Sequence, residues 1–151
     1  MTIRKIFQRD EKQIMALLHE YDKYEHKLDK RVKMDSKKEL KDFFDKIIKN
    51  KFAIGFVAED DAKIVGLISG IESKNIDGKI GKIHHLIISK KYRQKGLGKK
   101  LLKELEKHFK KKGCNTIQSF VFIKNKKVLK FYDKLKYTHN EEGFIIVKKL
   151  K

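Results

Sequence analysis

The sequence has one cysteine and no proline among its 151 residues. The single thiol, Cys114, excludes an internal disulfide, and the absence of a Cys/His cluster argues against a structural metal site. No stretch approaches the roughly 18 uninterrupted apolar residues of a membrane helix, and the first residues lack an apolar signal core. These absences favour a cytoplasmic protein that neither spans a membrane nor holds a metal.

The sequence also lacks a Gly/Ser-rich linker, an internal repeat and an extended low-complexity tract. Its length and its 40% hydrophobic content suit one folding unit. We therefore expect a single domain over residues 1–151.

Positive charge is in large excess and unevenly distributed. The chain carries a formal net charge of +19; residues 1–78 hold 17 basic and 15 acidic side chains, whereas residues 79–151 hold 22 and 5. Such an excess attracts anions, whether nucleotide, nucleic acid or membrane surface. A lysine-rich surface that serves only solubility is the alternative, so charge by itself names no partner.

The apolar pattern changes repeatedly between helical and strand periods. Helical spacing predicts helices after Asp10, over 36–50 with the capping-box pair Ser36 and Glu39, over 96–112, and from Asn125. Short apolar runs predict strands at 2–7, 52–58, 63–71, 80–88 and 115–123, with a last hairpin at 144–150. The run 80–88 is too apolar for an exposed edge and is expected at the centre. This order predicts an α/β (α+β) mixed sheet with helices packed against it.

The most informative stretch is the end of the strand 80–88 with the loop and amphipathic helix that follow it. Gly96 and Gly98 let the backbone approach a ligand closely, and the first amides of the helix are unpaired donors at the positive end of its dipole. Arg93 and Lys95 add charge, and arginine can hold phosphate oxygens with two parallel hydrogen bonds. The sequence therefore predicts an anion site here.

Two familiar phosphate loops do not match this stretch. A P-loop requires glycine five residues before Gly98 and Ser or Thr after Lys99, where the chain has Arg93 and Lys100. A dinucleotide fingerprint requires a third glycine, where the chain has Leu101. The remaining alternative to a ligand loop is that both glycines only shape a tight turn.

The residues that do match belong to two motifs. Arg93-Gln94-Lys95-Gly96-Leu97-Gly98 resembles the acyl-CoA-binding signature Arg/Gln-x-x-Gly-x-Gly/Ala of the Gcn5-related N-acetyltransferases, the GNAT family. Asn125 followed by Phe131-Tyr132-Asp133-Lys134-Leu135-Lys136-Tyr137 is similar to the family's Asn and Phe-Tyr-x-Lys-Leu-Gly-Phe, with Lys136-Tyr137 in place of Gly-Phe. The resemblance covers residues 52–151 and implies the GNAT fold, a mostly antiparallel central sheet flanked by helices.

The resemblance implies acetyl-CoA as co-substrate and assigns residues to it. The pyrophosphate would be bound by backbone amides of the loop and by its basic side chains, at Arg93, Gln94, Lys95, Gly96, Leu97, Gly98 and Lys99. The pantetheine arm and the acetyl carbonyl would lie along Leu86, Ile87 and Ile88, and Asn125 would contact the arm. As alternatives, Asn125 is an ordinary helix N-cap and the loop is purely structural.

Acetyl transfer to an amine requires removal of a proton from the nucleophile and benefits from a proton for the departing thiolate. Tyr132 matches the family's general-acid tyrosine, with a packed core residue as the alternative. The general base does not carry over, because Lys82 stands where many relatives have glutamate. Alternation sends His84 and His85 to opposite faces, and His84 shares the parity of Lys82, so we predict His84 as the base, with Glu72 second. The alternative is that both histidines are packed or hydrogen-bonded structurally.

These observations predict an acetyl-CoA-dependent N-acetyltransferase that acts by direct attack on a primary amine, with Cys114 taking no nucleophilic role. The alternatives are a non-catalytic acyl-CoA sensor and a nucleic-acid-binding protein that uses the basic helix 96–112. No aromatic residues interleave with the run Lys110-Lys111-Lys112, which disfavours nucleic acid. The acceptor is left open between small molecules and proteins, and a homodimer is also left open.

Overall fold

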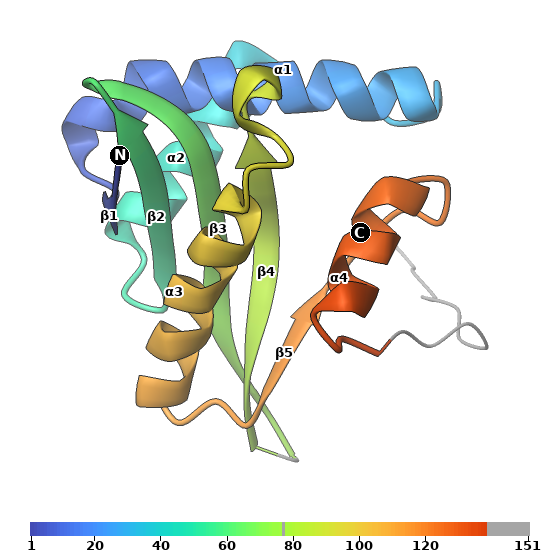
Figure 1. The fold of residues 1–151 in the computed structure, drawn as a ribbon. Coiled ribbons are helices and arrows are strands. Elements are labelled where there is room, and N and C mark those ends of the chain that lie inside the picture. Colours follow the sequence, from blue (N-terminus) through green and yellow to red (C-terminus); the bar gives the residue numbers. More distant parts are fainter. Residues whose placement is uncertain (77, 139–151) are drawn as a thin grey trace, which may run out of the picture. The chain divides into compact units, whose positions relative to one another are not determined.

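The structure is a computed structural model that describes residues 1–76 and 78–138 (Figure 1). The chain divides into two compact units, residues 1–120 and 121–151. The elements of the first unit, in chain order, are β1 (Thr2–Lys5), η1 (Gln8–Asp10), α1 (Glu11–Leu28), α2 (Lys37–Lys49), β2 (Ala53–Asp60), β3 (Lys63–Asn75), β4 (Gly78–Ile88), η2 (Lys90–Tyr92), α3 (Leu97–Lys111) and β5 (Thr116–Ser119). That residues 1–151 form one domain stays a prediction.

Five strands form one sheet in the order β1-β2-β3-β4-β5. Neighbouring strands are antiparallel except for β4 and β5, which run parallel because α3 connects them. A mixed sheet flanked by helices confirms the predicted fold class, and β4 lies between two partners as its apolar composition indicated. None of the helices within 1–76 and 78–138 combines the length and hydrophobicity needed to cross a bilayer.

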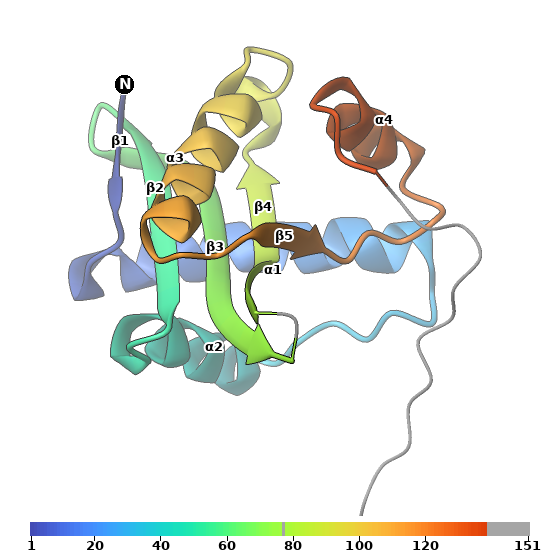
Figure 2. The same ribbon diagram turned by 90° about the horizontal axis from the view of Figure 1, so that it is seen from below.

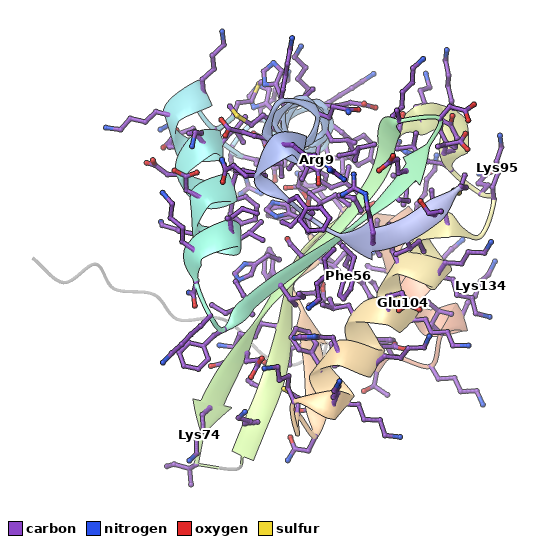
Figure 3. All side chains as sticks on the ribbon, turned by 90° about the vertical axis from the view of Figure 1, so that its left-hand side faces the viewer. Arg9, Phe56, Lys74, Lys95, Glu104 and Lys134 are labelled. Atoms are coloured by element: carbon purple, nitrogen blue, oxygen red, sulfur yellow. The ribbon has the colours of Figure 1, made fainter. Side chains whose placement is uncertain are left out.

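Helices cover both faces of this sheet. Figures 2 and 3 show α3 on one face and α2 on the other, with α1 beside α2. The ring of Phe56, labelled in Figure 3, lies on the α3 face with its centroid 6.2 Å from that of His108. On the opposite face α1 and α2 bury a cluster that includes Ile14, Phe44 and Leu67. The central strands are therefore apolar on both sides.

The local signals for the first two helices are largely as predicted. Ser36 Oγ accepts from the Glu39 amide at 3.2 Å, and the Glu39 carboxylate accepts from the Ser36 amide at 2.7 Å, which confirms the capping box. Helix α1 begins directly after Asp10, but the Asp10 side chain does not cap it. The carboxylate instead accepts from the Phe7 amide and pairs with Arg4 at 2.7 Å, so it ties β1 to the start of the helix.

The predicted strand 115–123 is shorter in the structure, where β5 ends at Ser119. Its ladder with β4 pairs Ile80 to Ile83 with Thr116 to Ser119 and goes no further. The next residue of β4, His84, is the extra residue of a β-bulge, because Ser69 pairs with His85 and Gly70 with Ile83. A bulge bends its strand and locally disrupts pairing, which explains why β5 loses its neighbour at this point.

The second unit contains one described helix, α4 (Lys126–Lys134). Asn125 caps it: the side chain accepts from the Val128 amide at 3.4 Å and is buried. This confirms a helix start at Asn125. The expected hairpin at 144–150 lies outside the described residues.

Close packing of α3 on the sheet gives a first prediction. A Cβ atom added at Gly81 would lie 2.2 Å from Cδ2 of Phe109, a buried ring of α3. We expect Gly81→Ala to lower the free energy of unfolding by about 1–3 kcal/mol, measured by urea denaturation. Because the clash is with this ring, Gly81→Ala combined with Phe109→Leu should cost less than the sum of the two single changes. An additive double mutant would contradict this packing.

Candidate functional site

The loop between β4 and α3 has an unusual backbone. Strand β4 makes its last link to β3 through the Ser89 amide, which donates to the Val65 carbonyl at 2.9 Å. After the short η2 turn, Gln94 and Gly96 both adopt left-handed conformations, with φ of 62° and 75°. Left-handed residues in such a turn direct successive amides toward one side, which forms an anion-binding concavity. A non-glycine residue held in this region is typical of ligand sites.

The same loop leaves a run of backbone donors unused. Within the described part of the chain, the amides of Gln94 through Lys99 have no hydrogen-bond partner. The first bond of α3 runs from the Lys100 amide to the Gly96 carbonyl at 3.2 Å, and neither a side-chain cap nor an acidic residue occupies the first turn. Six consecutive free donors at the positive end of a helix suit a phosphate or pyrophosphate group.

Basic side chains surround these amides, but Arg93 is already engaged. Its Nε donates to the Ile88 carbonyl at 2.9 Å, its NH2 lies 3.9 Å from Glu20, and its guanidinium lies 5.6 Å from the Tyr24 ring. Arg93 therefore holds the loop against the end of β4 and against α1. Lys95, labelled in Figure 3, is exposed, and its ammonium lies 5.5 Å from the centroid of the Tyr92 ring.

The end of β4 offers a second row of backbone groups next to the loop. Beyond Ile83 the strand has β3 as its one strand partner among the described residues. Leu86, Ile87 and Ile88 belong to this part, and the Ile87 side chain is buried in the α1/α2 core. Apart from the Ile88 carbonyl, which accepts from Arg93, the sheet leaves their backbone on the β5 side unpaired, so an extended ligand could hydrogen-bond along it.

The expectation that His84 and His85 lie on opposite faces is wrong, because the bulge at His84 interrupts the alternation. Both rings lie near Phe43 of α2, with centroid distances of 6.4 Å for His84 and 4.6 Å for His85. Counting through the register, the residue that shares the face of Lys82 is His85 rather than His84. The structure thus brings both histidines to the α1/α2 face of β4, His84 exposed and His85 mostly buried.

The two histidines differ in their electrostatics. Burial, with a smaller contribution from the neighbouring His84, lowers the pKa of His85 to about 4. Burial also lowers the pKa of His84, with a smaller contribution from Lys82. Both rings are therefore neutral at pH 7 and able to accept a proton or a hydrogen bond.

Two buried polar atoms on this face lack partners in the described structure. They are Nδ1 of His85 and Oγ of Ser69, the cross-strand neighbour of His85. Ser69 is fully buried. Buried polar groups are nearly always hydrogen-bonded, so a pair of exceptions at one place calls for an explanation.

Glu72, the second candidate for the base, lies elsewhere. Its register places it on the α3 face with Gly70, opposite to His85. The carboxylate is buried and lies 3.4 Å from Lys79 Nζ and 3.8 Å from His108 Nε2. Its charged partners are Lys79 and Lys112, the latter at 4.0 Å, because burial lowers the pKa of His108.

Cys114 is half-buried near this cluster, where burial and the charge of Glu72 raise the pKa of its thiol. A raised pKa keeps the thiol protonated and unreactive, which agrees with the expectation that Cys114 is not a nucleophile. In the part of the chain that the structure describes, no group of three or more His, Cys, Asp or Glu side chains could hold a metal ion.

Tyr132 and Asn125 belong to the second unit. They are two helical turns apart on α4, and both are buried. The Tyr132 ring packs against Phe131 and Tyr137, with centroid distances of 5.3 and 5.1 Å. That Tyr132 lies beside the CoA sulfur, and that Asn125 contacts the pantetheine arm, stay predictions.

The sequence alone did not find the residues of α1 and α2 that lie over the bulge. Tyr21 contacts His85 edge to face, with centroids 5.5 Å apart, and its hydroxyl bonds to Glu25. By helical spacing alone, Tyr21 is one more residue on the apolar face of its helix. The polar residue Glu25 one turn later was the available signal, because tyrosine and glutamate four residues apart lie on the same side of a helix.

Comparison with known proteins defines the class. The model of the Acetyltransferase (GNAT) family matches residues 14–137. The chain therefore belongs to the GNAT acetyltransferase family, and the predicted resemblance is confirmed.

Individual relatives agree with this assignment. An acetyltransferase of Sodalis glossinidius (strain morsitans) is 32% identical over 94 residues, which span 62% of this chain and 63% of that protein. An aminoglycoside antibiotic 6'-N-acetyltransferase from Acinetobacter haemolyticus has a TM-score of 0.80 at 15% identity over 100% of both chains. Aminoglycoside N-acetyltransferase AAC(6')-Iy in complex with CoA has a TM-score of 0.81 at 16% identity, over 99% of this chain and 95% of that one. These similarities confirm the GNAT fold.

The buried histidine gives a prediction about pH. The pKa of His85 falls from an ordinary value of 6.5 to about 4 on folding, so between these pH values the unfolded chain binds a proton that the folded chain does not. This residue leaves the free energy of unfolding unaffected above pH 6.5. As the pH drops from 6.5 toward 4, it lowers that free energy by about 3 kcal/mol.

Urea denaturation at pH 7, 5 and 4 measures this loss. His85→Gln, which cannot titrate in this range, should lose less stability between pH 7 and pH 4 than the unmodified chain. The same pH dependence in both proteins would contradict the prediction, because it would show that folding does not keep the His85 ring neutral.

Proposed function

We propose that this protein is an acetyl-CoA-dependent N-acetyltransferase that transfers the acetyl group to a primary amine of a small molecule or protein. The observation that carries the proposal is the run of six unpaired amides from Gln94 to Lys99. Family membership supports acetyl-CoA as the donor. Two solved relatives are aminoglycoside N-acetyltransferases, which supports an amine as the acceptor.

The residues present fit CoA. A pyrophosphate carries negative charge and acceptor oxygens, which the free amides and the start of α3 complement. A Cβ added at Gly96 would meet nothing within 4 Å, so the loop is open at that point. We assign the pyrophosphate to Gln94, Lys95, Gly96, Leu97, Gly98 and Lys99, and the pantetheine arm to Leu86, Ile87, Ile88 and Asn125. Arg93 would act by holding the loop in place.

The thioester supplies an activated acetyl group, and the protein has to manage two protons. His84 is exposed at the bulge and neutral at pH 7, so it can take the proton that the amine loses as its C–N bond forms. His85 is less suited, because its pKa of about 4 makes it a weak base. As the C–S bond breaks, Tyr132 would donate a proton to the departing CoA sulfur. The products are an acetylated amine and CoA, without an acyl-enzyme intermediate.

A non-catalytic acyl-CoA sensor would bind CoA without turnover, and a nucleic-acid-binding protein would respond to RNA instead. A cytoplasmic location and a homodimer stay predictions.

Ligand binding is tested by thermal unfolding with CoA, acetyl-CoA, NAD and a short RNA. At saturation CoA and acetyl-CoA should raise the Tm by about 5 °C, while NAD and RNA leave it unchanged. Gly96→Val should abolish the shift, because valine resists the φ of 75° found there.

Gly113→Val is the matched control. Gly113 has a φ of 79° after the other end of α3, and its Cβ position is also open, so the strain is similar while the loop is intact. This variant should be destabilised but keep the CoA shift. Loss of the shift in both variants, or an equal shift with RNA, would contradict a CoA site in the loop.

The role of Tyr132 is tested by Tyr132→Phe, which removes only the hydroxyl. Turnover should fall about 100-fold, with little change in the affinity for acetyl-CoA, because proton donation acts in the transition state. Tyr137→Phe, in a ring that packs on Tyr132, is the control and should keep its activity. Equal turnover of Tyr132→Phe and the unmodified enzyme would remove Tyr132 from this role.

A further inference from the structure

Two carboxylates of α1 stand out in a chain with a net charge of +19. Asp22 and Glu25 are partly buried, and neither forms an ion pair with any residue in the described ranges. Burial raises the pKa of both, and the nearby Asp22 raises that of Glu25 further. The sequence has 39 lysines and arginines, yet none of those in the described ranges pairs with these two half-buried carboxylates. Their negative charge is therefore not neutralised by a basic side chain.

Glu25 is connected to the bulge of β4 through Tyr21. The Tyr21 hydroxyl donates to Oε1 of Glu25, and the Tyr21 ring packs edge to face on His85. The ring of Phe43 in α2 also contacts His85 edge to face, with centroids 4.6 Å apart. A chain of contacts therefore runs from Glu25 through the Tyr21 ring to His85 and from there through Phe43 to His84.

The strand end of this chain of contacts carries the two orphaned polar atoms, Nδ1 of His85 and Oγ of its cross-strand neighbour Ser69. Neither ring nitrogen of His85 has a hydrogen-bond partner among the described residues. An acidic pair alone would not define a site, but buried polar groups left unsatisfied beside it indicate a place kept for a ligand or a bound water.

We propose that Glu25 and Asp22 form a subsite for the second, non-reacting ammonium group of a diamine or polyamine acceptor, whose reacting amine lies at the His84–His85 bulge. The proposal rests on the proposed function, because that function places the thioester along β4 and so requires the reacting amine at the bulge. A protonated amine supplies the cation that the carboxylates lack, and its methylene chain packs along the Tyr21 and Phe43 rings.

The expected selectivity follows from the charges. A monoamine has one amino group and cannot occupy both ends, whereas a diamine gains a charge-assisted hydrogen bond at Glu25. A substrate with a carboxylate at that end would be repelled. The two carboxylates thus favour binding of a cation locally, although the net positive charge of the protein repels cations.

Calorimetric titration of the CoA-loaded protein with 1,4-diaminobutane and with 1-aminobutane tests the proposal. We expect the diamine to bind more tightly by about tenfold or more, and Glu25→Gln to remove that advantage without changing monoamine or CoA binding. Asp42→Asn, which removes an exposed carboxylate of α2, is the matched control and should bind the diamine normally. Thermal unfolding should show Glu25→Gln to be no less stable than the unmodified protein, since burial disfavours the charged form.

Release of CoA thiol from acetyl-CoA is measured in parallel and separates the two proposals. Equal affinity for both amines, or a diamine preference that Glu25→Gln leaves intact, overturns the subsite even when acetyl transfer occurs. Diamine binding that depends on Glu25 without acetyl transfer to any amine supports the subsite and overturns the proposed function.

Discussion

The candidate site depends on backbone amides that are left without hydrogen-bond partners in the loop after β4. The amides of a strand normally donate to carbonyls of a neighbouring strand, and those of a helix donate to carbonyls of the same helix. The amides of Gln94 to Lys99 do neither among the described residues. Two left-handed residues, Gln94 and Gly96, set this geometry, and Arg93 fixes it to the Ile88 carbonyl and to α1. Since exposed amides at a helix start are complementary to phosphate, the ligand class follows from the backbone rather than from the lysine count.

The bulge at His84 is the second constraint, and it determines three features together. It ends the pairing of β4 with β5, it leaves the last residues of β4 open along one edge, and it turns both histidines toward α1 and α2. Along the chain, the two histidines, the open edge of β4 and the loop therefore come directly one after another. A CoA molecule bound at the loop with its arm along this edge would bring its thioester to the bulge, where the Tyr21 ring contacts His85.

Features encoded by neighbouring residues were predictable from the sequence. The capping box at Ser36, the glycines of the loop and the amphipathic face of α3 each act within a few residues, and the family resemblance drew on such local motifs. The bulge was not predictable, because strict alternation was the only available rule and one extra residue reverses it; this misplaced His85. The contact between Tyr21 of α1 and His85 depends on how α1 packs on the sheet, which no short pattern encodes.

The central claim is that the loop amides hold the CoA pyrophosphate, and amide NMR tests it directly. Titration of ¹⁵N-labelled protein with CoA should move the amide resonances of Gln94 to Lys99 most, while pantetheine, which has no pyrophosphate, should leave them in place. Unchanged loop amides at saturating CoA, with the largest shifts along the lysines of α3 instead, would contradict the account.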